Sequence, residues 1–219
     1  MTITIWGRLN SINVQKPIWA LEELGLAYEH IPLGGGFGGL TDTAYRALNP
    51  NVRVPTLKDG VTIVWESHAI LRYLAAEYGS GTLWPTDARQ RAAADQWVDW
   101  TATTFQAGWL RVFESVVRVP ESKRDSTVIA QAMDDANRLF RMLDAALADR
   151  QFLAGDRLTY GDIPAGVAMY RWMTMPIERQ SMPSLEAWYR RLDARPAFKK
   201  AVCVSYADMF GVPVPPAPR

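Results

Sequence analysis

The spacing of apolar residues changes part-way along the chain, and this change restricts the possible folds more than any other feature. Up to residue 79, short β-branched runs alternate with segments of helical spacing. The expected strands cover 2–6, 28–33, 53–57 and 61–65. From residue 87 onward, apolar residues recur at helical spacing and no convincing strand is found. We therefore predict a βαβαββα unit over residues 1–79, a linker at 80–86 and an all-helical unit over residues 87–219.

Several features of the helical segments lead to further predictions. Asp87 to Val117 is expected to form one long helix that is apolar on two faces, so we expect a second molecule to cover one face in a homodimer. Pro17 is expected in or near the first turn of its helix, because an interior proline removes a hydrogen bond. Thr159 and Asp162 have the spacing of a capping box, in which each side chain accepts from the backbone N–H of the other. Pro164 is expected to bend the helix that follows.

The composition and charge exclude several classes of protein. The 219 residues carry a net charge of +1 with basic residues scattered along the chain, so there is no electrostatic footprint for nucleic acid. No apolar run approaches the length of a membrane span, and the N-terminal "MTITIWGR" lacks the pattern of a secretion signal. Cys203 is the only cysteine, and with His30 and His68 it cannot form a zinc set. We expect a cytoplasmic protein that contains no disulfide and needs no metal.

The segment "RVPTLKDGVTIVWESHAILRYLA" places a proline at a strand entrance and a Glu-Ser pair at a helix start. Proline cannot donate to a sheet, and a cis Val54–Pro55 bond would turn the backbone groups of Val54 toward an extended ligand. Unpaired N–H groups at the helix start near Ser67 suit a carboxylate, and the side chain of Glu66 suits an ammonium. A peptide with an α-amino-acid end meets both requirements. A purely structural interpretation, in which Ser67 caps the helix and Pro55 begins the strand, stays open.

Several motifs resemble those of the cytosolic glutathione transferases over nearly the whole chain. "NPNVRVPTL" with "WESHAILRYLA" resembles the glutathione-site signature, "ALEELGLAYE" the first helix and second strand, and "LTYGDIPAG" the capping box of the helical domain. The resemblance implies a thioredoxin-like N-terminal domain, an all-helical C-terminal domain, a homodimer, and glutathione as co-substrate. It also implies that Val54, beside Pro55, pairs with the cysteinyl backbone of glutathione. Glu66 and Ser67 would hold the γ-glutamyl end, and Arg53 the glycine carboxylate.

The loop "WGRLNSINVQK" contains neither tyrosine nor cysteine, so the group that stabilises the thiolate has to be of another type. Ser11 stands where theta-like transferases carry serine, and Asn13 stands where nu-like bacterial members carry an amide. Either side chain can donate to sulfur, and a hydrogen bond of ~1.5–3 kcal/mol lowers the pKa of a thiol by about one to two units. Ser11 is also a candidate for the N-cap of the first helix.

Other residues complete the expected site. Leu9, Trp109 and Phe113 are candidates for an apolar pocket that holds the electrophile. The run from Gly34 to Gly39 fits the G-x-G-x-x-G pattern of dinucleotide sites, but the helix after it is too short for one, so we expect a lid beside the glutathione site. His68 is expected to face solvent.

The function predicted from these features is transfer of the glutathione thiolate to small electrophiles. Two alternatives stay open. One is glutathione-dependent disulfide reduction or peroxidase activity, which Asn13 supports, and the other is a non-catalytic binding role on the same fold.

Overall fold

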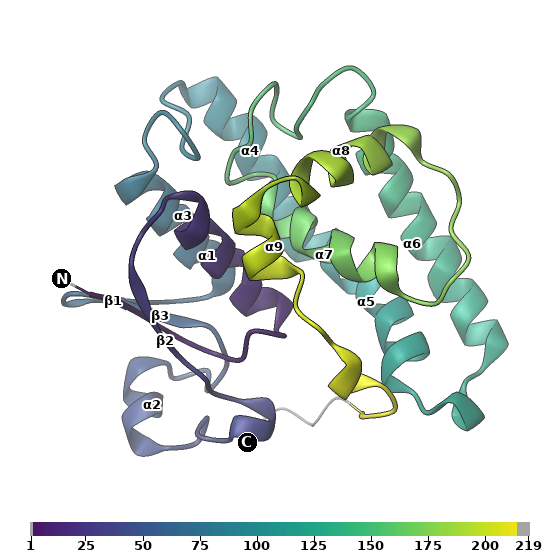
Figure 1. Ribbon diagram of the computed structural model, residues 1–219, viewed down its shortest axis with the longest axis horizontal. Helices are drawn as coiled ribbons and strands as arrows, with labels where there is room; N and C mark the ends of the chain where they lie inside the picture. Colours follow the sequence, from purple (N-terminus) through teal and green to yellow (C-terminus); the bar gives the residue numbers. More distant parts are fainter. Residues whose placement is uncertain (1, 214–219) are drawn as a thin grey trace.

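The computed structural model describes residues 2–213, which form a sheet-containing domain followed by a helical domain (Figure 1). The first domain has the predicted order βαβαββα. Its strands are β1 (Ile3–Trp6), β2 (Tyr28–Ile31), β3 (Thr56–Asp59) and β4 (Thr62–Trp65), and its helices are α1 (Ile12–Glu23), α2 (Thr43–Leu48) and α3 (Ser67–Tyr78). The strand order is β2-β1-β3-β4, with β1 parallel to β2 and antiparallel to β3. This mixed sheet followed by a helical domain confirms the predicted fold class.

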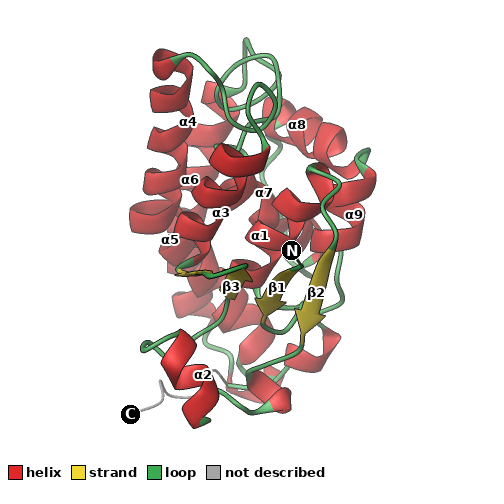
Figure 2. Ribbon diagram, turned by 90° about the vertical axis from the view of Figure 1, so that its left-hand side faces the viewer, coloured by secondary structure: helices red, strands yellow, loops and turns green. Residues whose placement is uncertain are grey.

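Alternation along the strands decides which side chains enter the core of the first domain. Ile3 and Ile5 on β1 are buried, and Ile5 pairs with Leu57 on β3, which is also buried. Helices α1 and α3 lie on one side of the sheet and α2 lies on the other (Figure 2). The strand β3 begins at Thr56, later than the sequence predicted, because Pro55 before it cannot donate to the neighbouring strand.

The second domain is helical, as predicted. Its α-helices are α4 (Ala88–Trp100), α5 (Gln106–Phe113), α6 (Ser126–Ala146), α7 (Ile163–Thr174), α8 (Pro183–Asp193) and α9 (Pro196–Val202). Two π-helical segments, Thr101–Phe105 and Glu114–Arg118, extend α4 and α5 into one continuous helical stretch from Ala88 to Arg118. The long helix expected over 87–117 is therefore present. The predicted linker at 80–86 falls between the end of α3 and the start of α4.

The second apolar face of this long helix is partly covered by the same chain. Trp97 donates its indole N–H to the carbonyl of Leu153 at 3.0 Å. Trp100 stacks on Phe105 of the same helical stretch, with 5.1 Å between the ring centroids, and both tryptophans are only partly buried. Side chains of the helical domain therefore pack against part of this face, and a second molecule over the rest stays a prediction.

Pro17 and Pro164 both depart from what the sequence predicted for them. Pro17 lies inside α1, beyond its first turn, so the helix has no N–H to donate to the carbonyl of Asn13. Pro164 lies in the first turn of α7, where its missing N–H would have no helical partner in any case. The bend expected at Pro164 therefore has no cause.

Helix α1 packs against helices of both domains. It packs against α3 in its own domain and against α7 and α9 in the other. The carboxylate of Glu23, near its end, accepts from Arg195 at 2.7 and 2.6 Å and from the indole of Trp19 at 2.8 Å. A Cβ on Gly166 of α7 would lie only 2.7 Å from the ring of Trp19, so the two helices approach closely. Within residues 2–213, each helix is too short or too polar to cross a bilayer.

Candidate active site

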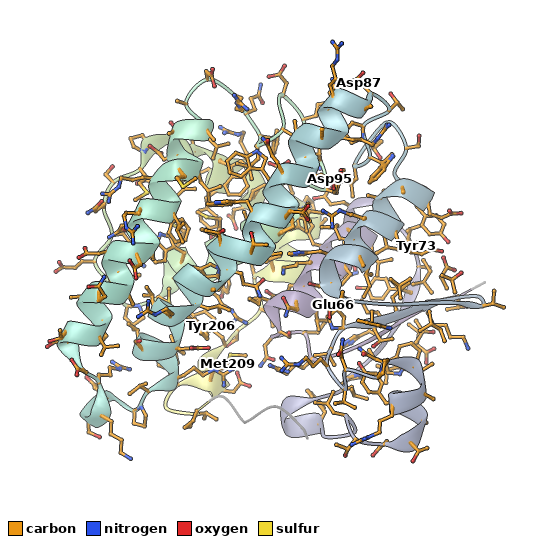
Figure 3. All side chains as sticks on the ribbon, turned by 180° about the vertical axis from the view of Figure 1, so that it is seen from behind. Glu66, Tyr73, Asp87, Asp95, Tyr206 and Met209 are labelled. Atoms are coloured by element: carbon orange, nitrogen blue, oxygen red, sulfur yellow. The ribbon has the colours of Figure 1, made fainter. Side chains whose placement is uncertain are left out.

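A cavity of about 310 Å³ opens where the start of α1, the loop before β3 and the start of α3 meet. We call it the first cavity, and its wall is formed by Asn13, Asn49, Asn51, Arg53, Val54, Pro55, Glu66 and Ser67. It brings together all five residues expected to hold glutathione and one of the two candidate thiolate donors. Glu66 lies toward the same end of the molecule as Tyr206 and Met209, whereas Asp87 lies at the opposite end (Figure 3).

The loop before β3 presents free backbone groups to the first cavity. The Val54–Pro55 bond is cis, as predicted. The preceding carbonyl, of Arg53, accepts from the hydroxyl of Tyr45 at 2.6 Å and from the amide of Asn49 at 2.8 Å, so the loop is anchored. Neither the N–H nor the C=O of Val54 forms a hydrogen bond within residues 2–213. Both groups are therefore available to an extended ligand.

The start of α3 presents a carboxylate and a helix N-terminus to the same cavity. Glu66 has a φ of 71°, a conformation that is uncommon for a residue with a Cβ and that gathers at ligand-binding sites. Among residues 2–213, its exposed carboxylate accepts only from Asn51, at 3.5 Å. Ser67 is the first residue of α3, and the N-cap position belongs to Glu66, so the interpretation of Ser67 as a cap is wrong. The first N–H groups of α3 have no helical acceptor and favour an anion.

The two candidate thiolate donors occupy different places. Ser11 is at the N-cap position of α1, and its carbonyl accepts from Val14 and Gln15, but its hydroxyl makes no capping hydrogen bond. Asn13, in the first turn of α1, lines the first cavity and Ser11 does not. Gly7 allows the loop before α1 to approach closely, because a Cβ there would lie 2.4 Å from Val14.

The sequence interpretation missed Lys16, which lies directly behind the first cavity. Its ammonium donates to Asn13 Oδ1 at 3.0 Å, to Gln106 Oε1 at 2.7 Å and to Ser67 Oγ at 3.5 Å. Burial lowers the pKa of Lys16 to about 7, and the nearby charge of Glu66 opposes this change. The available signal was a lysine three residues after Asn13, which places both side chains on one face of the helix.

A second cavity, of about 600 Å³, lies on the other side of the loop before α1. It is lined by Arg8, Leu9, Asn10, His30, Pro32, Phe37, Val204, Ser205, Ala207 and Asp208. Leu9 therefore lies in a pocket, as predicted. Trp109 and Phe113 do not line it, because they are only 1% and 2% exposed and form an edge-to-face pair in the core. Their assignment to the electrophile pocket is wrong, and their helical spacing is that of core residues.

The glycine-rich segment is not a dinucleotide loop. A short 3-10 turn, Gly35–Phe37, is followed only by the six-residue α2. A dinucleotide site requires a longer helix whose N-terminus faces the pyrophosphate. Phe37 is exposed and lines the second cavity, so this segment forms part of a cavity edge. That it acts as a lid stays a prediction.

The predicted capping box is half formed. The carboxylate of Asp162 accepts from the N–H of Thr159 at 3.0 Å, as predicted, and from the N–H of Leu153 at 2.8 Å. The hydroxyl of Thr159 accepts from Gly161 instead of from Asp162, and it donates to the Asp162 carboxylate at 3.2 Å. The box therefore joins the segment before α7 to the start of that helix.

The two histidines are placed differently from each other. His30 lies on β2, as expected, with Nε2 2.6 Å from the carbonyl of Gly7. His68 does not face solvent as expected, because its side chain is partly buried and its Nε2 atom is inaccessible to solvent. This burial, together with the neighbouring charges of Lys16 and Arg72, lowers the pKa of His68 to about 3. In the part of the chain that the structure describes, no group of three or more His, Cys, Asp or Glu side chains could hold a metal ion.

Comparison with known proteins identifies the family. Residues 10–77 match the N-terminal domain of glutathione S-transferases, and residues 101–196 match the C-terminal domain. The chain is 40% identical over 204 residues to glutathione S-transferase GstB of Escherichia coli, covering 92% of this chain and 98% of that protein. It is 31% identical to glutathione S-transferase 3 of Zea mays, covering 99% and 97%. A solved theta class glutathione S-transferase from Xanthomonas axonopodis pv. citri, with glutathione bound, has 50% identity and a TM-score of 0.89, covering 93% of this chain and 98% of that one. The chain therefore belongs to the glutathione S-transferase family.

Proposed function

We propose that this transferase binds glutathione in the first cavity and conjugates the glutathione thiolate to a small electrophile in the second cavity. One combination of features carries the proposal. The first cavity contains the unpaired backbone of Val54, the exposed carboxylate of Glu66 and the N-terminus of α3 at Ser67. An extended peptide with an α-amino-acid end satisfies all three.

The orientation of glutathione follows from the charges. Its γ-glutamyl ammonium binds Glu66, and the carboxylate of the same residue binds Ser67 and the start of α3. The cysteinyl N–H and C=O pair with Val54 as an added strand would. The glycine carboxylate binds Arg53, whose exposed side chain contributes only about 0–1 kcal/mol. Affinity is therefore the sum of several modest contacts.

Asn13 and Ser11 stabilise the thiolate. The cysteine of glutathione has an ordinary pKa of about 8.5, and the thiolate is the reactive form. A donor that contributes ~1.5–3 kcal/mol brings this pKa close to neutrality. The thiolate then attacks an electrophilic carbon, a C–S bond forms, and the leaving group departs with the electrons of its bond. The thiol proton has already passed to solvent or to a base.

The second cavity suits an electrophile with an apolar body. Leu9 and Phe37 supply exposed apolar surface there, and Arg8 supplies a positive charge. Both cavities adjoin the loop before α1, because Asn10 lines one and Asn13 lines the other. A sulfur held near the start of α1 is therefore close to both.

Disulfide reduction is the second candidate, because Asn13 lines the first cavity and Ser11 does not. Turnover with a chloro-nitroaromatic, a hydroperoxide and a mixed disulfide, measured side by side with glutathione, separates the candidates. The proposed function predicts the highest kcat/KM with the chloro-nitroaromatic. A higher value with the mixed disulfide would move the assignment to a reductase, and no turnover with any of the three would contradict both.

The homodimer is part of the proposal, on a different surface from the one first expected. Val61, just before β4, and Ile63 and Trp65 on β4 form an exposed apolar strip at the edge of the sheet, and Val61 is 98% exposed. Exposed apolar strips on sheet edges favour association. Light scattering at micromolar concentration tests the homodimer, and a monomer would contradict it. The cytoplasmic location expected from the sequence stays a prediction.

A further inference from the structure

Lys16 is a buried lysine whose hydrogen-bond partners, in the described part of the chain, are all uncharged. Its side chain lies on α1 and the residue is 1% exposed. Its three acceptors are the amide oxygens of Asn13 and Gln106 and the hydroxyl of Ser67. They come from α1, α5 and α3, so the ammonium lies where the two domains meet behind the first cavity.

No carboxylate in the described chain pairs with this charge at close range, because no Asp or Glu within residues 2–213 forms an ion pair with Lys16. The three hydrogen bonds offset part of the cost of burying a cation, and the bond to Ser67, at 3.5 Å, is long. Burial lowers the pKa of Lys16 to about 7, so these contacts compensate the charge only in part. The charged form would be stabilised by an anion that enters the first cavity.

The contact with Lys16 also decides how Asn13 faces the cavity. An ammonium has donors only, so it bonds the oxygen of the Asn13 amide. The NH2 group of that amide is then left for the cavity, where it can donate to an acceptor. Sulfur in its thiolate form is such an acceptor, whereas a second ammonium is not.

We infer that Lys16 is a positioning residue that provides the counter-charge for the glutathione thiolate and holds the Asn13 amide with its N–H groups toward the sulfur. This rests on the proposed function, in which the first cavity binds glutathione. In this step the S–H bond of glutathione breaks and the neutral amine of Lys16 gains the proton. A thiolate–ammonium pair results.

The other ionisable groups around Lys16 do not replace it. Glu66 and His68 lie at the start of α3. The charge of Glu66 raises the pKa of Lys16, and the charge of Lys16 lowers the pKa of His68. His68 is neutral near pH 7, because its pKa is lowered to about 3. Arg72, further along α3, is paired with two aspartates of α4. The residue that α5 contributes, Gln106, is uncharged.

The variant Lys16→Met tests the inference, because methionine fills similar space without charge or donors. The thiolate of bound glutathione is titrated by its ultraviolet absorbance, and binding of S-methylglutathione is measured in parallel. Lys200→Met is the matched control, since Lys200 is an exposed lysine on α9.

We expect Lys16→Met to raise the titration midpoint of the bound thiol by about one unit or more, a tenfold loss of thiolate below the midpoint. S-methylglutathione, which has no thiol, should bind equally well to the variant and to the wild type. Lys200→Met should change neither value. An unmoved midpoint in Lys16→Met would overturn the inference. So would an equal loss of affinity for both ligands, because the partner of Lys16 would then be a carboxylate.

The wild-type protein provides a second test that needs no substitution. At about pH 8, Lys16 of the protein without ligand is mostly a neutral amine, because its pKa is about 7, and a free thiol is mostly protonated, because its pKa is about 8.5. When glutathione binds, this amine should take up and keep the proton that the thiol loses. Calorimetry in buffers of different ionisation enthalpy should show fewer protons released than thiolates formed. Equal numbers would contradict the proton transfer. If the wild type binds neither ligand, the proposed function itself fails, which is a different outcome.

Discussion

Replacing Asp162 by alanine should destabilise the protein by more than the loss of an ordinary helix cap. The residue is 0% exposed, and its carboxylate accepts from the backbone N–H groups of Leu153 and Thr159. Alanine leaves both buried donors without an acceptor, and each unsatisfied donor costs about 1–3 kcal/mol. We expect a loss of about 2–6 kcal/mol in the free energy of unfolding, against about 0.5–2 kcal/mol for a cap at the surface.

The charge of Asp162 adds a pH dependence of known sign. Burial raises the pKa of this carboxyl to about 6 from its usual 3.8, although its hydrogen bonds act in the opposite direction. The folded state therefore binds the proton more tightly than the unfolded state does. Stability contributed by the protonated carboxyl is fully present below pH 3.8 and is lost as the pH rises toward 6. A difference of about two units corresponds to about 3 kcal/mol.

Urea denaturation of the wild type, Asp162→Ala and Asp162→Asn at several pH values measures both effects. Asp156→Ala is the matched control, because Asp156 lies nearby and is exposed. At this chain length, each kcal/mol shifts Tm by about 2–4 °C, so Asp162→Ala should melt well below the control. Asp162→Asn should lose the pH dependence between pH 3.8 and 6. If Asp162→Ala and Asp156→Ala unfold at the same urea concentration, the reasoning is refuted.

Four other substitutions address the site and the assembly. Asn13→Ala should raise the pKa of the bound thiol by about one to two units and Ser11→Ala by less, as ultraviolet titration would show; midpoints that stay in place in both variants would assign the effect to the helix dipole and backbone donors. Glu66→Gln should weaken glutathione binding about tenfold in calorimetry and leave the thiol pKa unchanged, so unaltered affinity would remove Glu66 from the site. Ile63→Lys should yield a monomer in light scattering, and a dimer that survives it would place the interface elsewhere.

The residues expected to hold glutathione could be grouped from the sequence because they are local. Arg53 to Pro55 and Glu66 with Ser67 belong to one hairpin and the helix after it, so a single stretch of sequence brings them to one cavity. Strand alternation and helical spacing likewise give the order of the first domain, since each element buries one face. Which end of the ligand each residue holds comes from the family resemblance and stays a proposal.

Contacts between distant segments were not accessible in the same way. Nothing in the sequence shows that Lys16 on α1 meets Gln106 on α5, because 90 residues separate them. Periodicity also cannot tell a core aromatic from one that lines a pocket, and Trp109 and Phe113 proved to be core. The apolar faces of the long helix are ambiguous for the same reason, since partner chains and neighbouring helices cover such faces equally well.

Contacts between early and late segments of the chain affect how the protein folds during its synthesis. Asn10 donates to Asp208 at 2.9 Å, and Glu23 on α1 pairs with Arg195 just before α9, so segments synthesised early depend on segments synthesised later. A ribosome releases the N-terminal segment early, and domains tend to fold in that order. The sheet can assemble while the face of α1 that α7 and α9 later cover is still bare. A nascent chain halted before α9 would therefore expose the apolar surface of α1 and an incomplete second cavity. We expect chaperones to bind such a chain until α9 has been synthesised.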